Sequence, residues 1–244
     1  MSPVAAVIFD VDGTLAETER NGHRVAFNRA FAEAGLPWQW DDDLYGELLA
    51  VTGGRERIAH FARRHAPHWL AEPGAQARVA ALHARKNAQY AAIVEAGKLR
   101  LRPGLPQVLD ALAAAGVRLA IATTTSRANL EVLLRATLGA GGPGRFEAAI
   151  CGEDVARKKP DPEAYLLALR RLRLAAADCV AVEDSANGLR AALAAGIPTV
   201  IVRSLYTRAE DFSGALRVFD GYAGDSTPPG DERALSAAFF VHGR

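Results

Sequence analysis

Short apolar runs alternate along this chain with segments of helical composition. The first run, residues 4–9, is almost continuously apolar and ends at an Asp-Val-Asp-Gly turn. Similar runs span residues 117–122, 148–151, 179–182 and 199–202. A strand that is apolar along its whole length is typical of a parallel sheet, because helices cover both faces of such a sheet. The runs therefore predict the strands of a buried parallel sheet.

The segments between the later runs predict helices. They span residues 104–115, 127–138, 162–172 and 185–195, and Gly116 and Gly196 stand where a C-terminal cap is expected. Strand and helix alternate from residue 104 onward, which favours an α/β fold with a doubly wound, Rossmann-like parallel sheet. Whether residues 232–240 form a last helix stays open at this point.

Residues 16–102, here called the helical insert, have a different character. Alanine, arginine and histidine recur there at helical spacing, without a convincing strand, and the segment ends at the turn signal Leu-Arg-Pro-Gly of residues 101–104. We expect an inserted α-helical cap domain at 16–102, with residues 1–15 and 103–244 forming the α/β core. The glycine-rich residues 139–144 lack the lysine and hydroxyl of a phosphate-binding loop, so we expect a surface loop there.

Charge and cysteine content exclude several classes of protein. The 29 basic and 28 acidic residues nearly cancel, so the chain lacks the global positive charge of a non-specific nucleic-acid binder. Asp10 and Asp12 interrupt the first apolar run too early for a signal peptide or membrane span. Cys151 and Cys179 lie in apolar runs and are expected to be reduced core thiols. We expect a cytoplasmic protein without nucleic-acid or membrane partners.

The motif Asp10-Val11-Asp12-Gly13-Thr14 directly follows the first predicted strand. Ligands of open α/β sheets bind beyond the carboxyl ends of the strands, so both carboxylates are expected in a site. Two acids separated by one residue suit a hard cation and a reacting phosphate, and Gly13 permits a tight turn. Aspartate and glycine also occur in ordinary turns, so the motif alone leaves a purely structural interpretation open.

Further polar groups follow the later predicted strands. Thr123 carries a hydroxyl that can bond a phosphate oxygen, and Lys159, just ahead of a helix, can neutralise charge on a nucleophile and phosphate. Glu183 and Asp184 supply oxygen ligands for Mg²⁺. Singly, each can be a helix cap or a solvated side chain. Their joint order along the strands favours a site for phosphate chemistry.

This order resembles the haloacid dehalogenase superfamily of phosphotransferases, whose motifs are Asp-x-Asp-x-Thr, a Ser or Thr, a Lys and an acidic pair. The helical insert lies where subclass I members carry their cap. The resemblance implies that Asp10 is the nucleophile that forms an aspartyl-phosphate and that Asp12 is the general acid and later base. It also implies that Thr123 and Lys159 hold the phosphoryl oxygens.

The same resemblance implies Mg²⁺ as cofactor. Its ligands would be Asp10, the main-chain oxygen of Asp12, and Asp184, with Glu183 close behind. The chemistry is consistent, because carboxylate attack divides hydrolysis into two displacements while metal and lysine offset the charge on the transferring group.

Within the superfamily, residues 15–19, 23–28, 52–57, 101–104 and 122–129 are most similar to the CbbY-type xylulose-1,5-bisphosphate phosphatases, which are associated with carbon-fixation (Calvin cycle) operons. The similarity implies a substrate site lined by Glu17, Thr52, Gly53, Gly54, Arg55, His83, Lys86, Thr124, Arg127 and Asn129. The expected partner is a small sugar phosphate, preferably a ketose bisphosphate, and the expected oligomeric state is a monomer.

A bisphosphate needs a second cationic site for the phosphate that stays. Arg55 suits this role, because Gly53 and Gly54 let backbone N–H groups approach an anion that the guanidinium binds with two hydrogen bonds. Lys86 and Arg127 are further candidates.

Other basic residues of the insert are expected to be structural. We expect Arg57, Arg63 and Arg64 on the solvated face of a helix. His60, His65 and His68 are expected at the surface, because no carboxylate or cysteine completes a metal site with them.

The reaction type remains open between hydrolysis and transfer. Related mutases such as β-phosphoglucomutase carry a cap histidine where this chain has Gly22, and His23 follows one residue later. Either an inserted residue in the first insert helix restores the direction of His23, or the feature is absent. The alternatives to a sugar bisphosphate phosphatase are a hexose phosphate mutase, a broad-specificity sugar-phosphate phosphatase, and a catalytically silent sugar-phosphate-binding module.

Overall fold

The computed structural model describes residues 4–225, 227–228 and 231–242 and contains a six-stranded parallel sheet. The strand order is β3-β2-β1-β4-β5-β6, so the first strand lies inside the sheet. The strands are β1 (Ala6–Phe9), β2 (Arg118–Ala122), β3 (Ala148–Ile150), β4 (Cys179–Glu183), β5 (Thr199–Val202) and β6 (Arg217–Phe219). The chain order reverses at β1, which is where a doubly wound sheet forms its ligand crevice. The predicted fold class is confirmed.

Helices cover both faces of this sheet. Alternate residues of each strand point to opposite faces, and here the residues on both faces are apolar. Val7 and Phe9 of β1 pack on the side of α6 (Leu105–Ala114) and α7 (Arg127–Leu138). Ala6 and Ile8 pack on the other side, against α8 (Glu163–Leu172) and α9 (Ala186–Ala194). The strands are thus buried on both faces, as their continuous apolar runs predict.

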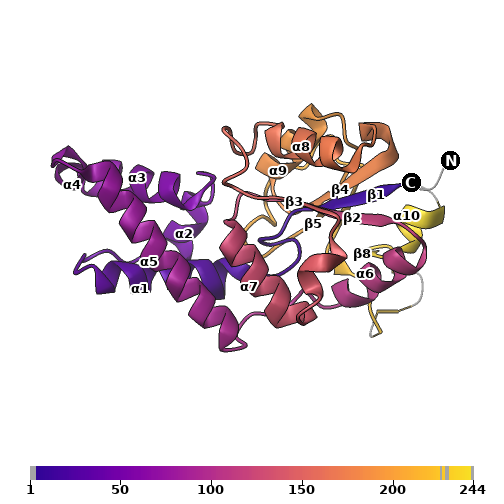
Figure 1. Ribbon diagram of the computed structural model, residues 1–244, viewed down its shortest axis with the longest axis horizontal. Helices are drawn as coiled ribbons and strands as arrows, with labels where there is room; N and C mark the ends of the chain where they lie inside the picture. Colours follow the sequence, from indigo (N-terminus) through magenta and orange to yellow (C-terminus); the bar gives the residue numbers. More distant parts are fainter. Residues whose placement is uncertain (1–3, 226, 229–230, 243–244) are drawn as a thin grey trace.

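The helical insert folds around an aromatic core of its own. It contains a π-helix, η1 (Glu19–His23), followed by α1 (Arg24–Glu33), α2 (Asp42–Leu48), α3 (Gly54–His65), α4 (Pro67–Ala71) and α5 (Ala75–Glu95). Its core includes Phe27, Phe31, Trp40, Tyr45 and Phe61, all of them buried. Figure 1 shows α1–α5 gathered beside the sheet rather than on one of its faces.

The chain leaves and re-enters the core at neighbouring points. Ala16 forms an antiparallel bridge with Leu101, and the amide of Arg102 donates to the carbonyl of Leu15 at 2.9 Å. Arg102 is 7% exposed, and its guanidinium donates to main-chain carbonyls of Gly13, Val202, Arg203 and Asp220. A buried cation needs such partners, since an uncompensated charge in the interior is costly. The two crossings are therefore tied to one place in the core.

Most core elements agree with the sequence-based expectation to within one or two residues. Gly116 and Gly196 adopt positive φ angles of 73° and 77° after their helices, as capping glycines do. Cys151 and Cys179 are buried and are not joined to each other in a disulfide. Among the described residues, no helix combines the length and apolar composition of a membrane crossing.

The remaining short elements were not predicted in this form. They are η2 (Gly142–Arg145), within the expected loop, and η3 (Ala176–Asp178), β7 (Gly221–Tyr222) and β8 (Ala234–Leu235). The sequence left open whether residues 232–240 form a last helix. A short last helix, α10 (Ala238–His242), is present but begins closer to the end of that segment.

Candidate active site

Acidic and basic side chains meet at the carboxyl ends of the central strands. Asp10 follows β1, Thr123 follows β2, and Glu183 and Asp184 lie at the end of β4. β1 pairs in parallel with both β2 and β4, so these residues share one edge of the sheet. Lys159, from the segment between β3 and α8, joins them, and all five are buried.

The ammonium group of Lys159 lies between two carboxylates. Its Nζ donates to Asp10 Oδ1 at 2.6 Å, to Glu183 Oε1 at 2.5 Å and to the carbonyl of Ala122 at 2.8 Å. Tyr165 also donates its hydroxyl to Glu183 Oε1 at 2.5 Å. Lys159 therefore holds the Asp10 carboxylate in one orientation, while Glu183 anchors Lys159 from behind.

Burial and crowding of like charges dominate the acidity of this cluster. Burial raises the pKa of Asp10 to about 8, with Glu183 and Asp12 acting in the same direction and Lys159 opposing them. Burial, Asp10 and Glu183 likewise raise the pKa of Asp184 well above its usual value. Burial alone would lower the pKa of Lys159, but Asp10 and Glu183 outweigh it and raise that pKa. The cluster thus favours another positive charge beside its carboxylates.

These carboxylates fit a divalent cation. Ligand atoms of Asp10, Glu183 and Asp184 lie within 4.8 Å of one another, the one such group of His, Cys, Asp and Glu side chains in the described part of the chain. Oxygen donors of this kind suit Mg²⁺. Glu183 Oε1 is already bonded to Lys159 and Tyr165, which leaves Asp10 and Asp184 as the better oriented ligands.

Gly13 is required beside this group for a steric reason. Its φ angle is 87°, and a Cβ atom there would come 2.1 Å from Asp184 Oδ2. A side chain at this position would displace the Asp184 carboxylate, so the tight turn that the motif predicts is also what admits Asp184.

Thr123 and Thr124 occupy different places at the end of β2. Thr123 is buried, and its Oγ1 accepts a hydrogen bond from the amide of Thr125 at 3.2 Å. Thr124 lines both cavities described below.

His23 points at Asp12, which answers the question that the sequence left open. His23 is the last residue of the π-helix η1 and is buried, and its Nε2 lies 2.9 Å from Asp12 Oδ1. A π-turn accommodates one inserted residue without changing the direction of the helix that follows. The ring of His23 stacks on Tyr90, with centroids 4.2 Å apart, and this contact fixes its plane.

Lys86 determines which ring nitrogen of His23 donates a hydrogen bond to Asp12. Its Nζ lies 2.8 Å from His23 Nδ1, and burial lowers the Lys86 pKa to about 8, with Asp12 and Glu19 opposing the shift. An ammonium group only donates, so Nδ1 accepts and Nε2–H donates to Asp12. Burial would raise the Asp12 pKa, but His23, Thr18 and Lys86 outweigh it and lower that pKa to about 2.

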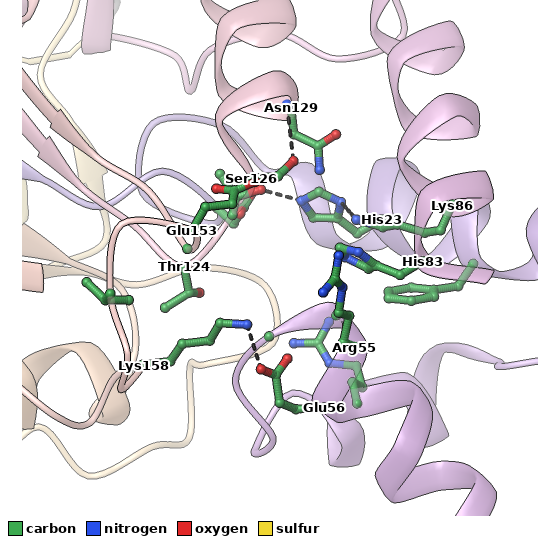
Figure 2. Close-up of a pocket in the computed structure, with 18 of the residues that line it drawn as sticks. His23, Arg55, Glu56, His83, Lys86, Thr124, Ser126, Asn129, Glu153 and Lys158 are labelled. Carbon is green, nitrogen blue, oxygen red and sulfur yellow. Dashed lines mark hydrogen bonds and ion pairs between the residues drawn. The ribbon is translucent and has the colours of Figure 1, made fainter. Parts of the chain in front are cut away.

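Two adjoining cavities open from Asp12. The small cavity, of about 90 Å³, contains Asp10, Lys159 and Asp184 in its lining. The large cavity, of about 440 Å³, lies between the core loops and the helical insert (Figure 2). Lining residues common to both are Asp12, Glu19, Arg57 and Thr124. A ligand that spans both cavities would therefore pass Asp12 and Glu19.

The large cavity brings together most of the substrate-binding residues expected from the resemblance. These are Gly53, Gly54, Arg55, His83, Lys86, Thr124 and Asn129, whereas Thr52 lines the small cavity. Figure 2 shows Arg55 and His83 on the insert side, facing Thr124 and Lys158 across the cavity.

Glu17 and Arg127 are not supported as substrate ligands. Glu17 is 46% exposed, lines neither cavity, and its Oε1 lies 3.6 Å from Arg102. Arg127, the first residue of α7, also lines neither cavity and pairs with Asp154 at 2.5 Å. Glu19, two residues beyond Glu17, lies in the cavity wall instead.

The expectation that Arg57 is a solvated side chain is wrong. Arg57 is 7% exposed, and its Nη1 donates to the hydroxyl of Tyr45 at 2.9 Å. Its Nε donates to the carbonyls of Leu48 and Val51. Tyr45 in turn donates to Glu19 Oε2 at 2.5 Å, so Arg57 and Tyr45 together hold the Glu19 carboxylate at the junction of the cavities.

The other basic residues of α3 and α4 behave as expected. Arg63, Arg64, His65 and His68 are exposed and His60 is half-buried, and none lines either cavity.

Sequence reasoning did not place Glu19 and Lys158 among the residues of the cavity walls. Lys158 stands next to Lys159, and Glu19 lies within the segment that carries the family resemblance, so position along the chain was the available signal. Neither position predicts which way the side chain points.

Comparison with known proteins supports the interpretation of this geometry. The sequence profile described as haloacid dehalogenase-like hydrolase matches residues 4–196. The chain belongs to the haloacid dehalogenase-like hydrolase family. Within this hydrolase family, it is 49% identical over 233 residues to the plasmid protein CbbY of Cupriavidus necator, which covers 96% of this chain and 91% of that protein. It is 46% identical to CbbY of Cereibacter sphaeroides, over 90% of this chain and 93% of that protein.

Solved structures of relatives share the fold of this hydrolase. CbbY from Rhodobacter sphaeroides in complex with phosphate matches with a TM-score of 0.82 and 45% identity, covering 89% of this chain and 94% of that one. A mutant of the same protein, in complex with xylulose-1,5-bisphosphate, matches equally well, with a TM-score of 0.82.

Proposed function

We propose that this hydrolase is a Mg²⁺-dependent phosphatase that removes one phosphate from a small sugar bisphosphate, with xylulose-1,5-bisphosphate as the leading substrate. One observation carries the proposal. The Asp10 carboxylate, held by Lys159 beside Asp184, lies in a small cavity that adjoins a larger one with Arg55, His83 and Lys158 in its wall. This arrangement suits a ligand with one reacting phosphate and a second anionic group some distance away.

Asp10 acts as the nucleophile in the proposed reaction. Its carboxylate oxygen attacks phosphorus, the bond from phosphorus to the sugar oxygen breaks, and an aspartyl-phosphate forms. Lys159, already bonded to Asp10, lies where it can stabilise the charge of the transferring group. A bound Mg²⁺ on Asp10 and Asp184 would add positive charge at the same place and favour the ionised form of Asp10.

Asp12 supplies and later removes a proton. In the first step it protonates the departing sugar oxygen, and in the second it takes a proton from the water that attacks the aspartyl-phosphate, releasing inorganic phosphate. The low pKa of Asp12 beside His23 keeps its carboxylate ionised, as a base must be before it accepts a proton. The acid role requires that a bound phosphate dianion, adding negative charge nearby, raise that pKa.

The helical insert, residues 16–102, serves in this proposal as the cap domain over a core of residues 1–15 and 103–244. It supplies Glu19, Arg55 and His83 to the large cavity, so the insert selects the part of the substrate that does not react. The bisphosphate is favoured because one CbbY relative is known in complex with xylulose-1,5-bisphosphate.

The decisive measurement is phosphate release from a panel of phosphorylated sugars that includes xylulose-1,5-bisphosphate, xylulose 5-phosphate and hexose monophosphates. We expect the highest kcat/KM for the ketose bisphosphate. Similar values across the panel would indicate a broad-specificity phosphatase, and no release from any ester in the presence of Mg²⁺ would indicate a silent binding module.

Asp10→Asn should abolish turnover and keep the fold, because an amide of the same shape cannot attack phosphorus. We expect residual activity below about 1% of wild type, since loss of a nucleophile costs several orders of magnitude. Circular dichroism and binding of the bisphosphate check the fold. Activity above that level would contradict the covalent mechanism.

A hexose phosphate mutase is the second candidate, and the orientation of His23 favours it more than the sequence did. The histidine contacts Asp12 at 2.9 Å, although it stands one residue later than the cap histidine of the mutases. The two reactions differ in the fate of the phosphoryl group. Stoichiometric release of inorganic phosphate in a single turnover supports hydrolysis, whereas isomerised hexose phosphate without release supports the mutase.

A further inference from the structure

Two consecutive lysines serve different cavities. Lys159 is buried between Asp10 and Glu183 beside the small cavity. Lys158 instead lines the large cavity, where its Nζ donates to Glu56 Oε1 at 2.7 Å. Glu56 lies on α3, next to Arg55, so this ion pair joins the core to the helical insert across the cavity (Figure 2).

Positive charge gathers at this end of the large cavity. Burial together with Lys86, Arg55 and Lys158 lowers the pKa of His83 to about 3, so these cations all act on one point of the wall. Glu56 is the carboxylate that pairs with Lys158 there. A further anion placed beside Arg55 and Lys158 would meet positive charge that Glu56 offsets only in part.

The backbone beside the ion pair leaves room for it. Gly53 has a φ angle of 97°, and a Cβ atom there would lie 2.3 Å from Glu56 Oε2 and 2.6 Å from Lys158 Nζ. Any other residue would push the pair apart or out of the cavity. The glycine therefore keeps both Lys158 and Glu56 next to the main chain that precedes Arg55.

Both members of the ion pair are partly exposed to solvent. Glu56 is 47% exposed and Lys158 is 23% exposed. Pairs with this much access to solvent contribute little to stability, because water screens the charges. A phosphate dianion carries more charge than a carboxylate and presents more acceptor oxygens, so it competes well for the same ammonium group.

We propose that Lys158 is a second cation for the phosphate that is not transferred, and that Glu56 is an internal counter-ion which this phosphate displaces. This inference rests on the proposed function, since it assigns a ligand to the distal end of the same substrate. It adds a specificity-determining residue from the core to those of the insert. A ligand without a distal phosphate leaves the Lys158–Glu56 pair intact.

The competing explanation is that the pair is a latch which holds the insert against the core. The two explanations predict opposite signs for Glu56→Gln. Removing a counter-ion frees Lys158 and strengthens binding of the bisphosphate, whereas removing a latch weakens it. Lys158→Met weakens binding in both cases, so the Glu56 variant decides between them.

The test measures Kd for xylulose-1,5-bisphosphate by calorimetry in the non-hydrolysing Asp10→Asn protein, and KM in the otherwise wild-type enzyme. We expect Lys158→Met to raise both by about tenfold. Glu56→Gln should lower Kd by about threefold, which is the range of an exposed ion pair. The double variant should match Lys158→Met alone, and Lys158→Arg should restore most of the affinity.

Arg157→Met is the matched control, because this neighbour loses the same charge but is 71% exposed and pairs with Asp161. It should change Kd by less than about twofold, as a distant surface charge does. An increase of Kd in Glu56→Gln, or an unchanged Kd in Lys158→Met, would overturn the inference. Failure of the wild-type enzyme to release phosphate from any sugar bisphosphate would instead overturn the proposed function.

Discussion

At the scale of single residues, the most specific predictions for the large cavity concern Arg55 and His83. Both line its wall, and Arg55 is exposed, so its guanidinium is available to a ligand. They differ in charge, because a guanidinium group is a permanent cation, whereas His83, whose pKa burial lowers to about 3, is neutral near pH 7.

Arg55→Ala should raise KM sharply for a sugar bisphosphate and leave hydrolysis of p-nitrophenyl phosphate nearly unchanged. The reporter has a single phosphate, held beside Asp10 and Lys159, and does not reach Arg55. Loss of a charge-assisted pair costs roughly 2 to 3 kcal/mol, or about 30- to 150-fold in kcat/KM. Arg63→Ala, on the exposed face of the same helix, is the control. Equal losses on both substrates would place Arg55 in the catalytic machinery instead.

The His83 pKa, lowered to about 3 by burial and the neighbouring cations, predicts a pH dependence of stability. Between about pH 6.5 and that value the unfolded chain binds a proton at His83 that the folded protein does not, so the free energy of unfolding falls as pH falls. Above pH 6.5 the contribution is constant. Denaturant titrations should show a smaller loss between pH 6.5 and 4 for His83→Gln than for wild type. Parallel curves for the two proteins would contradict this assignment.

Residue-level prediction succeeded where the fold itself determines direction. Asp10, Thr123 and Asp184 follow parallel strands, whose carboxyl ends meet at one edge, so their proximity follows from the strand pattern alone. Glu17 and Glu19 show the limit of this reasoning. Both belong to the same motif, but only the turn of η1 and the hydrogen bond from Tyr45 put Glu19 in the cavity wall. Those contacts come from distant segments, so the local sequence does not reveal them.

At the scale of elements, the π-helix η1 is the feature with the clearest consequence. A π-helical turn holds about one residue more than an α-helical turn, and His23 at the end of η1 contacts Asp12. Asn21, within η1, is exposed, so its side chain contributes little to packing.

Deletion of Asn21 should convert η1 to a regular α-helical turn and preserve the His23–Asp12 contact, leaving kcat within about threefold of wild type. The reason is that one residue fewer restores the α-helical period without rotating α1. Deleting Arg85, ahead of Lys86 on the regular helix α5, is the control, because it rotates Lys86 by about 100° away from His23. Steady-state kinetics and a melting curve suffice, and a deletion at Asn21 as damaging as one at Arg85 would contradict the role of the π-turn.

Element-level prediction from sequence was accurate for the core and incomplete at its edge. Strands β1, β2, β4 and β5 are continuous apolar runs because both their faces are covered, and such runs are distinctive. Strand β6 lies at the sheet edge, where only Phe219 is buried, so its sequence lacks that signature. The burial of Arg57 was not predicted for a related reason. The main-chain carbonyl that accepts its hydrogen bond lies at the end of α2 and cannot be recognised from the sequence of α3 alone.

At the scale of the whole molecule, the carboxylates at the sheet edge predict a dependence on divalent cations. Asp10, Glu183 and Asp184 lie within 4.8 Å of one another and are offset in part by Lys159. Folded protein gathers these charges and the unfolded chain does not, so a cation that binds them stabilises the fold.

Chelation should stop turnover, and Mg²⁺ should restore it better than Ca²⁺, because calcium's larger and looser coordination shell misplaces the phosphate relative to Asp10. Mg²⁺ should also raise the melting temperature of the wild-type protein. Asp184→Asn should show a smaller rise, and Ser213→Ala, on the exposed surface, should behave as wild type. Full activity in excess chelator would contradict the metal assignment.

Arg102 lies where the chain passes between the sheet and the insert. Both passages of the chain between sheet and insert are fastened to the same small region of the core by its guanidinium and by the Ala16–Leu101 bridge. In a rotation of the insert about this region, the displacement of each residue grows with its distance from Arg102. His23, close to the crossing in sequence, would sweep a short arc, whereas Arg55 and Glu56 on α3 would sweep a long one. Opening would thus release the far end of a bound sugar before it disturbs the groups around Asp12.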